Sequence, residues 1–329
     1  MRALVTGSTG CLGRNLVQRL LVQGHDVTAS GRNKAIGKTL SDKGARFVRA
    51  DLEDAGAIAK TCLGQDVVFH CGGLSSPWGP WAAFESANVR GTKNVTQGCL
   101  AAGVQRLVHI SSPAIYFDFK SRRGIPEDTC LPDRPANNYA KSKRMAEAIV
   151  KDACADGLST VTIRPRGIFG PHDTALFPRL MRVAEREWVP LFDAGKATID
   201  LTYVENVVDA LLAAGIASEK VSGKTYNITN GQPVTVAEFL RNVFDVMGVA
   251  TKFRSIPYSV GLAAATSSEM IALLRGGHRE PKITRYAVGL LSKDQTLDIS
   301  AAKNDLAYTP QVSIDSGLAA FSEWWHRHD

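Results

Sequence analysis

The sequence contains no C-x-x-C pair, no Lys/Arg run of the kind found in nucleic-acid-binding arms, and no apolar stretch of about 18 residues. Its six cysteines are widely spaced, which favours reduced thiols over a disulfide framework or a zinc ribbon. The net charge of +7 comes from scattered residues. The apolar run Ala3–Val5 is too short for a signal peptide. We expect a cytoplasmic protein with no nucleic-acid partner and no transmembrane segment.

Short β-rich runs alternate with helical segments through the first half of the chain. The strands are continuous apolar runs, which is typical of a parallel sheet covered by helices on both faces. This rhythm predicts an α/β fold with a Rossmann-type, doubly wound parallel sheet. The expected strands are residues 3–6, 26–30, 46–49, 67–70, 106–111 and 160–164, and the expected helices are residues 12–23, 83–102 and 138–156.

The pattern changes after Pro165. We expect a Rossmann domain over residues 1–165 and a smaller region over residues 166–329 that mainly binds substrate. Some segments of the second region are expected to return to the first, so that the two are partly interleaved. The second region is predicted to hold helices at 176–186, 204–218 and 236–247, a strand at 225–228, a less regular stretch at 256–297 and a helix that ends near Trp325.

A glycine-rich turn joins the first expected strand to the first expected helix. Glycines permit a tight turn, a close backbone approach to a pyrophosphate, and close packing of the helix on the strand. The alternative is an ordinary strand-to-helix turn, but the position at the start of a βαβ unit favours dinucleotide binding. The expected cofactor contacts in this turn are Gly7, Thr9, Gly10, Cys11, Leu12 and Gly13.

The second expected strand ends without an acidic residue. NAD-preferring sites carry an Asp or Glu at this place, where it binds the ribose 2′-hydroxyl. Here the chain continues as Ser30-Gly31-Arg32, and a guanidinium can bind a 2′-phosphate in a fork. The sequence therefore predicts a preference for NADP(H), with NAD(H) as the second option. Arg32 is the main determinant, assisted by Ser30 and Lys34; the alternative is that Arg32 is a solvated loop residue.

Tyr139 and Lys143 are four residues apart on an expected helix, which places both side chains on one face. A nearby ammonium favours the phenolate, so Lys143 is expected to lower the pKa of Tyr139 and fit it for proton transfer. A surface helix pair is the alternative. Ser112 follows the strand expected at 106–111, at the edge where ligands bind a parallel sheet. It can stabilise negative charge on a substrate oxygen, or simply form the turn before Pro113.

The order of glycine-rich turn, Ser112, Tyr139 and Lys143 resembles the extended short-chain dehydrogenase/reductase superfamily over nearly the full chain. The resemblance includes Asn88–Asn94, the segment His70–Gly73, and Arg164–Pro171. It implies a structural or proton-relay role for Asn88, a bond from Lys143 to the nicotinamide ribose, and a homodimer formed through the helices that contain Asn88 and Tyr139. It also implies cofactor contacts from Asp51, Leu52, Cys71, Gly72 and Pro165.

Two of these positions have other readings. Asp51 can instead cap a helix. His70 can be read as a metal ligand, but no second ligand is suitably spaced, so we expect a packed histidine and no metal site.

Within the superfamily, the chain lacks the acidic pair of the dehydratases, because Pro113-Ala114 follow Ser112. Four segments resemble the 3β-hydroxysteroid dehydrogenase-like branch, and the loop Ser75–Trp81 resembles that of bacterial 2-alkyl-3-ketoalkanoate reductases of olefin biosynthesis. The resemblance implies reduction of a hydrophobic ketone to an alcohol, or the reverse. The four segments are residues 202–208, 226–233, 280–285 and 308–314.

Several readings stay open at this stage. The alternative functions are a sugar-nucleotide epimerase and a non-catalytic NADP(H)-binding redox sensor. The apolar segment 258–274 can form a lid, a pocket wall, a peripheral membrane contact or a plain amphipathic helix over the core. Trp78 and Trp81 can flank the substrate entrance or pack against their neighbours.

Overall fold

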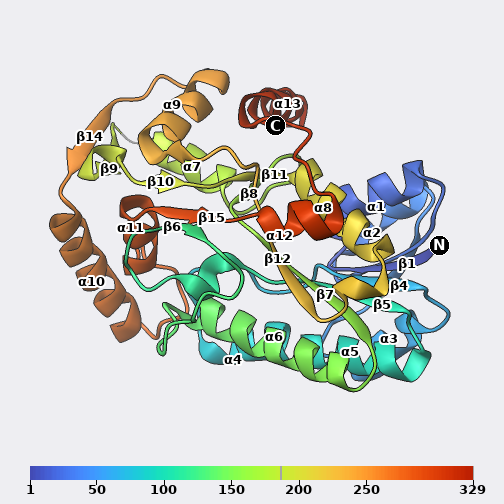
Figure 1. Cartoon of the computed structure of the whole chain (residues 1–329). Helices are drawn as coiled ribbons and strands as arrows, with labels where there is room; N and C mark the ends of the chain where they lie inside the picture. The colour runs from blue at the N-terminus through green and yellow to red at the C-terminus, as the bar shows by residue number, and fades with distance from the viewer. Residues whose placement is uncertain (186, 329) are drawn as a thin grey trace.

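The computed structural model describes residues 1–185 and 187–328 and is built around a parallel sheet of seven strands (Figure 1). The strand order is β12-β7-β5-β4-β1-β2-β3, which confirms the doubly wound sheet predicted from the sequence. The strands are β1 (Arg2–Thr6), β2 (Asp26–Gly31), β3 (Arg46–Arg49), β4 (Val67–His70), β5 (Arg106–Ile110), β7 (Ser159–Pro165) and β12 (Lys224–Ile228).

Helices cover both faces of this sheet, as the apolar strands require. Figure 1 shows α5 and α6 side by side below the sheet, with α1 and α8 on its other side. One face packs against α1 (Cys11–Val22), α2 (Lys34–Asp42) and α8 (Val204–Ile216), and the other against α3 (Ala55–Cys62), α5 (Gly91–Ala102) and α6 (Asn138–Ala155). The helices α2 and α3 were not predicted.

The helix expected over residues 83–102 is interrupted by a π-helical turn. It starts as α4 (Trp81–Phe84), widens at Glu85–Arg90, and continues as α5. Such a wide turn inserts one extra residue into the helix and often marks a functional site. The widened turn contains Asn88.

The second half of the chain forms small sheets and further helices. The stretch 256–297, expected to be less regular, holds two helices and a strand. The first helix coincides with segment 258–274, for which a helix was one of the open readings. Helix α7 ends at Ala184. The end expected from the sequence was Arg186, which lies outside the described residues. These elements are β6 (Arg122–Ile125), α7 (Phe177–Ala184), β8 (Ile168–Phe169), β9 (Val189–Phe192), β10 (Thr198–Ile199), β11 (Thr202–Tyr203), β13 (Val234–Thr235), α9 (Val236–Val246), β14 (Phe253–Ile256), α10 (Tyr258–Leu274), α11 (Arg285–Ser292), β15 (Gln295–Leu297), α12 (Ser300–Leu306) and α13 (Ile314–His328).

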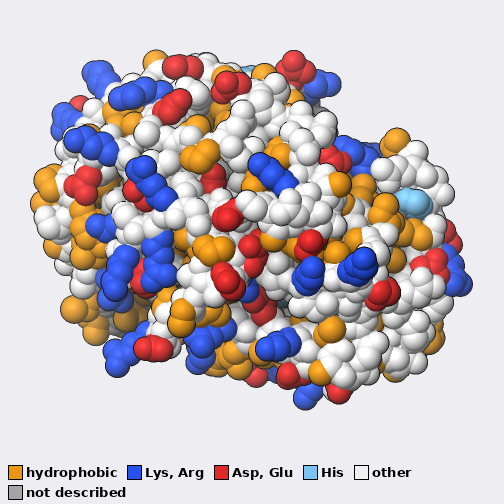
Figure 2. All heavy atoms as spheres, in the orientation of Figure 1, with side chains coloured by type: hydrophobic (Ala, Val, Ile, Leu, Met, Phe, Trp, Pro, Cys, Tyr) orange, Lys and Arg blue, Asp and Glu red, His pale blue; other side chains and the backbone are white. Residues whose placement is uncertain are grey.

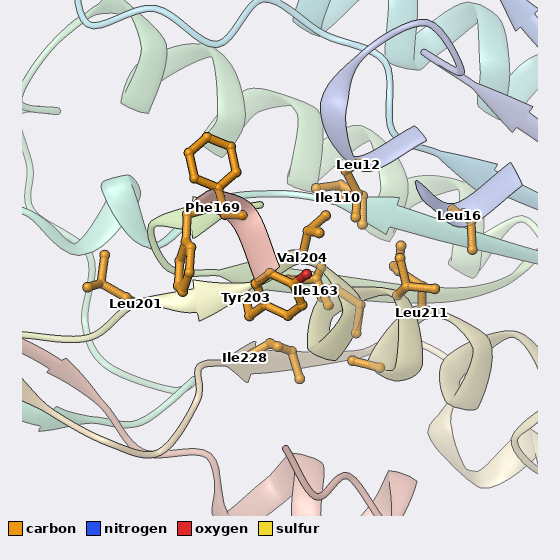
Figure 3. Close-up of a cluster of buried hydrophobic side chains, with 14 of the residues drawn as sticks. Leu12, Leu16, Ile110, Ile163, Phe169, Leu201, Tyr203, Val204, Leu211 and Ile228 are labelled. Atoms are coloured by element: carbon orange, nitrogen blue, oxygen red, sulfur yellow. The ribbon is translucent and has the colours of Figure 1, made fainter. Parts of the chain in front are cut away.

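Segments from beyond Pro165 complete the first sheet. In Figure 3, Ile110, Ile163 and Ile228 come from the neighbouring strands β5, β7 and β12 and pack near Val204 and Leu211 of α8. The core therefore joins residues far apart in the sequence.

Over the described part of the chain, no helix is long and apolar enough to cross a membrane. All six cysteines are free thiols.

A buried ion pair ties helix α6 to strand β7. The Arg164 side chain donates Nε to Glu147 Oε1 (2.8 Å) and Nη2 to Glu147 Oε2 (2.6 Å), and the two side chains are only 7% and 14% exposed. Arg164 also donates to the Tyr116 hydroxyl and to the Glu127 carbonyl. Removing one partner of such a pair leaves an uncompensated charge in the interior.

We predict that Glu147→Ala lowers the free energy of unfolding by about 3–5 kcal/mol, because it leaves the Arg164 guanidinium buried without its carboxylate. Chemical denaturation measures the change. The control is Glu323→Ala, whose partner Arg327 is 70% exposed; its loss should cost less than about 1 kcal/mol. Equal, small losses in both variants would contradict the structural role of the buried pair.

Candidate active site

The turn after β1 brings three backbone segments into contact. Gly7 has φ +66°, and a Cβ added there would lie 2.5 Å from the Gly72 Cα. A Cβ added at Gly13 would lie 2.3 Å from the Gly7 carbonyl oxygen. Both contacts are with backbone, which cannot move aside, so these positions require glycine. The turn therefore holds β1, α1 and the end of β4 together at the carboxyl edge of the sheet.

The same turn leaves the start of α1 open to a ligand. Its N-cap is Gly10, which makes no side-chain cap, and the first turn of the helix contains no acidic residue. Free backbone N–H groups at a helix start suit a pyrophosphate, so the residues here fit the dinucleotide predicted from the sequence. Thr9 lies against Gly31, Leu12 is buried, and the Cys11 thiol donates to the Pro171 carbonyl (3.4 Å).

A cavity of about 240 Å³ lies at the ends of β2 and β3, and two arginines line it. Arg32 is one of them; its side chain is 78% exposed, and its Nη1 lies 3.8 Å from Asp51 Oδ2. Arg49, the last residue of β3, is the other and was missed in the sequence, although its pairing with Gly31 places it here. Ser30 is buried in β2, whereas Lys34 is exposed at the start of α2.

The reading of Asp51 as a helix cap is wrong. Asp54 caps α3 and accepts from the Ala57 N–H (2.9 Å), while Asp51 also lines the cavity with Arg32. Farther along the edge, a Cβ added at Gly72 would lie 2.8 Å from Leu52 Cδ1. Two further residues were predicted to contact the cofactor, Cys71 and Pro165. Burial raises the pKa of the Cys71 thiol to about 12. Pro165 is the last residue of β7.

Tyr139 and Lys143 lie one helical turn apart on α6, at the carboxyl end of β5. Lys143 is buried, and its Nζ donates to the Ile110 carbonyl oxygen (2.7 Å). Burial lowers the pKa of Lys143 to about 8, with Glu147 acting in the opposite direction. The ammonium is therefore held by a strand and stays charged at neutral pH.

The expected direction of the Tyr139 shift is wrong for the protein alone. Burial raises the pKa of Tyr139, and hydrogen bonding with the Ser112 and Ser75 hydroxyls acts against it. Lys143 is not among the causes of that shift; its ammonium donates to the Ile110 carbonyl. At neutral pH the phenol therefore carries its proton and can donate it.

Ser112 forms the turn before Pro113, and its contact with a substrate oxygen stays a prediction. Its Oγ accepts from the Ala114 N–H (3.2 Å) and so caps the 3₁₀ turn Pro113–Tyr116. It also interacts with the Tyr139 phenol. Ser75, from the loop that follows β4, is a second hydroxyl at this phenol that the sequence did not single out as a site residue.

Asn88 holds the loop after β4 against helix α6. Its Oδ1 accepts from the Leu74 N–H (2.6 Å), and its Nδ2 donates to the Leu74 carbonyl (3.0 Å) and to Ser142 Oγ (2.8 Å). These bonds occupy the amide group within the protein. Asn88 is therefore a positioning residue: it bonds Ser142, which directly precedes Lys143 in the sequence.

His70 is a packed histidine. Its ring nitrogens lie 2.8 Å from Thr6 Oγ1 and 3.1 Å from Thr92 Oγ1, and the side chain is fully buried. Burial lowers its pKa to about 3, so the ring is neutral. Among the described residues, no three His, Cys, Asp or Glu side chains are grouped as metal ligands would be.

Helix α11 brings Tyr286 to the site, which sequence analysis missed because this stretch was taken as irregular. The phenol lies within electrostatic range of Tyr139 and of Arg166. Its ring meets Phe117 edge-on, with 5.6 Å between the ring centroids. The side of the site facing α11 is thus aromatic, with Arg166 as a cation near it.

The loop of the two tryptophans is tied to its surroundings. Trp78 Nε1 donates to the Gly277 carbonyl (2.9 Å), just past α10, and Lys141 Nζ lies 4.0 Å from the Trp81 ring centroid. Both rings therefore pack.

Helix α10 is not a plain amphipathic helix over the core, because only Gly261, Ala265 and Glu269 are buried. Figure 2 shows hydrophobic side chains at the left edge, over α10. The exposed apolar side chains of α10 are Val260, Met270, Ile271, Leu273 and Leu274.

Comparison with known proteins places this arrangement among dinucleotide-dependent enzymes. Residues 3–229 match the model of the NAD dependent epimerase/dehydratase family. The chain is 39% identical to the uncharacterized protein YbjS of Escherichia coli K12, covering 100% of this chain and 98% of the relative.

Two further relatives have named activities. A ketoreductase of Stigmatella aurantiaca, named for a 4-hydroxy-2-methyl-3-oxo-4-farnesyl-3,4-dihydroquinoline-1-oxide, is 33% identical over 98% of this chain and 96% of its own. The 2-alkyl-3-oxoalkanoate reductase of Shewanella oneidensis is 32% identical over 96% and 84%.

A solved structure shares the fold. It is the UDP-glucuronic acid 4-epimerase of Bacillus cereus in complex with NAD, with a TM-score of 0.79, 20% identity and 99% coverage of both chains.

The lowered pKa of Lys143 predicts the high-pH limb of the activity profile. The ammonium loses its charge as the pH rises through about 8, so kcat/KM, which reports groups of the free enzyme, should fall above that pH. Lys143→Arg keeps a charge at alkaline pH, and the limb should move upward in its residual activity. An unchanged limb in Lys143→Arg would assign the fall in activity to another group. A flat wild-type profile to pH 9.5 would contradict the prediction.

Proposed function

This chain belongs to the NAD dependent epimerase/dehydratase family, the extended short-chain dehydrogenases/reductases, and we propose that it reduces a ketone to a secondary alcohol with NADP(H). The observation that carries the proposal is the protonated Tyr139 phenol beside the Ser112 and Ser75 hydroxyls. A phenol that holds its proton is suited to donate it to an alkoxide that forms from a ketone. The same residues serve the reverse reaction.

Each residue of the site has its own role in the proposed reduction. When bound, the cofactor supplies a hydride to the carbonyl carbon. Ser112 hydrogen-bonds the substrate oxygen and stabilises the charge that develops on it. Tyr139 passes its phenolic proton to that oxygen. Lys143, fixed by the Ile110 carbonyl, would hydrogen-bond the ribose of the nicotinamide and keep a positive charge at this edge of the sheet. Asn88 keeps the loop after β4 in place.

The substrate we propose is hydrophobic, as in a 2-alkyl-3-keto acid or a steroid-like ketone. Two relatives are named for ketones that carry apolar groups, a farnesyl group in one and an alkyl group in the other. The aromatic side of the site, with Phe117 and Tyr286, supports an apolar substrate because such surfaces favour burial of alkyl groups.

The cofactor preference we propose is for NADP(H). Two guanidinium groups, Arg32 and Arg49, line the cavity at the ends of β2 and β3. Asp51 partly balances them, but β2 ends without the carboxylate that would repel a 2′-phosphate. A homodimer through α5 and α6 is also proposed; each helix exposes a large apolar side chain, Leu100 and Met145.

Tyr139→Phe tests the proton donor. We expect turnover to fall by about 10²- to 10⁴-fold, the usual contribution of a positioned acid, while NADPH binding stays within a factor of about three. NADPH oxidation with a panel of hydrophobic ketones measures turnover, and fluorescence titration measures binding. Near-normal turnover in the variant would refute this mechanism. An epimerase would instead convert sugar nucleotides without net NADPH consumption.

Arg32→Ala tests the cofactor preference. Loss of charge-assisted hydrogen bonds to a 2′-phosphate should weaken NADPH binding by about 10- to 100-fold and leave NADH binding nearly unchanged. Lys38→Ala is the matched control, because it removes an exposed charge of α2 that does not line the cavity. Wild-type enzyme with equal kcat/KM for the two cofactors would count against the preference.

A further inference from the structure

One buried cation in this protein lacks the partners that its neighbours have. Arg106 pairs with Glu219 (2.6 Å) and donates to backbone carbonyls, and Arg164 pairs with Glu147. The Arg166 residue is only 9% exposed. Yet among the described residues its guanidinium makes no hydrogen bond and no ion pair. Buried charges are ordinarily paired. The Arg166 nitrogens are not among the fully enclosed side-chain atoms without a partner, so these free donors are open to a ligand.

The backbone of Arg166 is fixed beside the reacting groups. Its N–H donates to the Ile228 carbonyl (3.0 Å), and its carbonyl accepts from Thr202 Oγ1 (2.6 Å). Ile110 of β5 pairs with Ile163 of β7, so Ser112 and Arg166 leave adjacent strands at the same edge of the sheet. Neighbouring strands are about 4.8 Å apart. The backbone of Arg166 is therefore held next to the strand that leads to Ser112.

The surroundings of Arg166 balance its charge only in part. The groups whose charges act on it are Asp200 and Tyr286. Asp200 forms no ion pair with it; one carboxylate oxygen accepts from the Leu297 N–H (2.7 Å), and the other is buried without a partner. Tyr286 lies within range of both Arg166 and Tyr139, so the unpaired cation and the proton donor face a common neighbour.

We propose that Arg166 binds the carboxylate of a 3-oxo acid whose ketone oxygen lies against Ser112 and Tyr139. This inference rests on the proposed ketone reduction and names its substrate class. A guanidinium fork matches the two oxygens of a carboxylate. In a 3-oxo acid a single carbon separates the ketone carbon from the carboxylate, so one small site must hold both groups. Ser112 and Arg166 follow the adjacent strands β5 and β7 at one edge of the sheet.

The contrary interpretation is that Arg166 balances Asp200 and serves only the fold. The two interpretations differ in what a neutral side chain at residue 166 does to different substrates. A carboxylate-binding residue affects acids and spares neutral ketones. A residue that only balances Asp200 affects stability, and with it the turnover of every substrate.

The experiment compares a freshly saponified 2-alkyl-3-oxoalkanoate with its methyl ester, using NADPH oxidation by wild type and Arg166→Met. Wild type should favour the acid. Arg166→Met should lose about 10- to 100-fold in kcat/KM for the acid, with the ester within about threefold of wild type. Arg166→Lys keeps the positive charge but not the two-pronged guanidinium, so its kcat/KM for the acid should lie between those of wild type and Arg166→Met. Equal losses on both substrates, or none on either, would overturn the proposal.

Two additions keep the result decisive. If Arg166→Met is unstable, the double variant Arg166→Met/Asp200→Asn removes the carboxylate left unbalanced. A purely structural Arg166 would then regain activity on acid and ester together, whereas the carboxylate-binding role predicts recovery on the ester alone. If wild type oxidises no NADPH with any ketone, the proposed function fails. Thermal-shift titration with the 2-alkyl-3-hydroxyalkanoate still decides on Arg166, since its binding should weaken at least tenfold in Arg166→Met.

Discussion

Two buried cations hold helix α6 against the sheet, and the site depends on that contact. Lys143 bonds to the Ile110 carbonyl at the end of β5, and Glu147, one turn further along α6, accepts both ends of the Arg164 fork from β7. These bonds fix the rotation of α6 about its own axis. Tyr139, one turn before Lys143, is thereby held beside Ser112. The catalytic geometry and the packing of the central strands are one arrangement.

The features predictable from the sequence are those that local chemistry determines. The strand-turn-helix around Gly7, Gly10 and Gly13 was predictable because a tight turn of this kind needs glycines, as the close backbone contacts of Gly7 and Gly13 show. The parallel sheet followed from apolar strands at regular intervals. Tyr139 and Lys143 were predictable as a pair because helical spacing places them on one face.

The features that could not be predicted depend on residues distant in sequence. Arg166 forms no ion pair with Asp200, one of whose oxygens accepts from the Leu297 N–H while the other has no partner. No local pattern in the sequence reveals that arrangement. Tyr286 reaches the site through α11, a short helix more than 140 residues after Tyr139 in the sequence. The pKa of Tyr139 is raised by its burial, so the spacing of Tyr139 and Lys143 could not give its direction.

The edge position of β12 has a consequence for how the protein is made. Strand β7 ends at Pro165, but its outer neighbour β12 begins at Lys224, and α8, which covers the same strands, lies between them. While the ribosome synthesises residues 166–223, β7 is an open sheet edge with one face uncovered, the kind of surface that pairs with other chains. Vectorial synthesis therefore leaves the nascent cofactor-binding half exposed to aggregation until residue 228 has emerged.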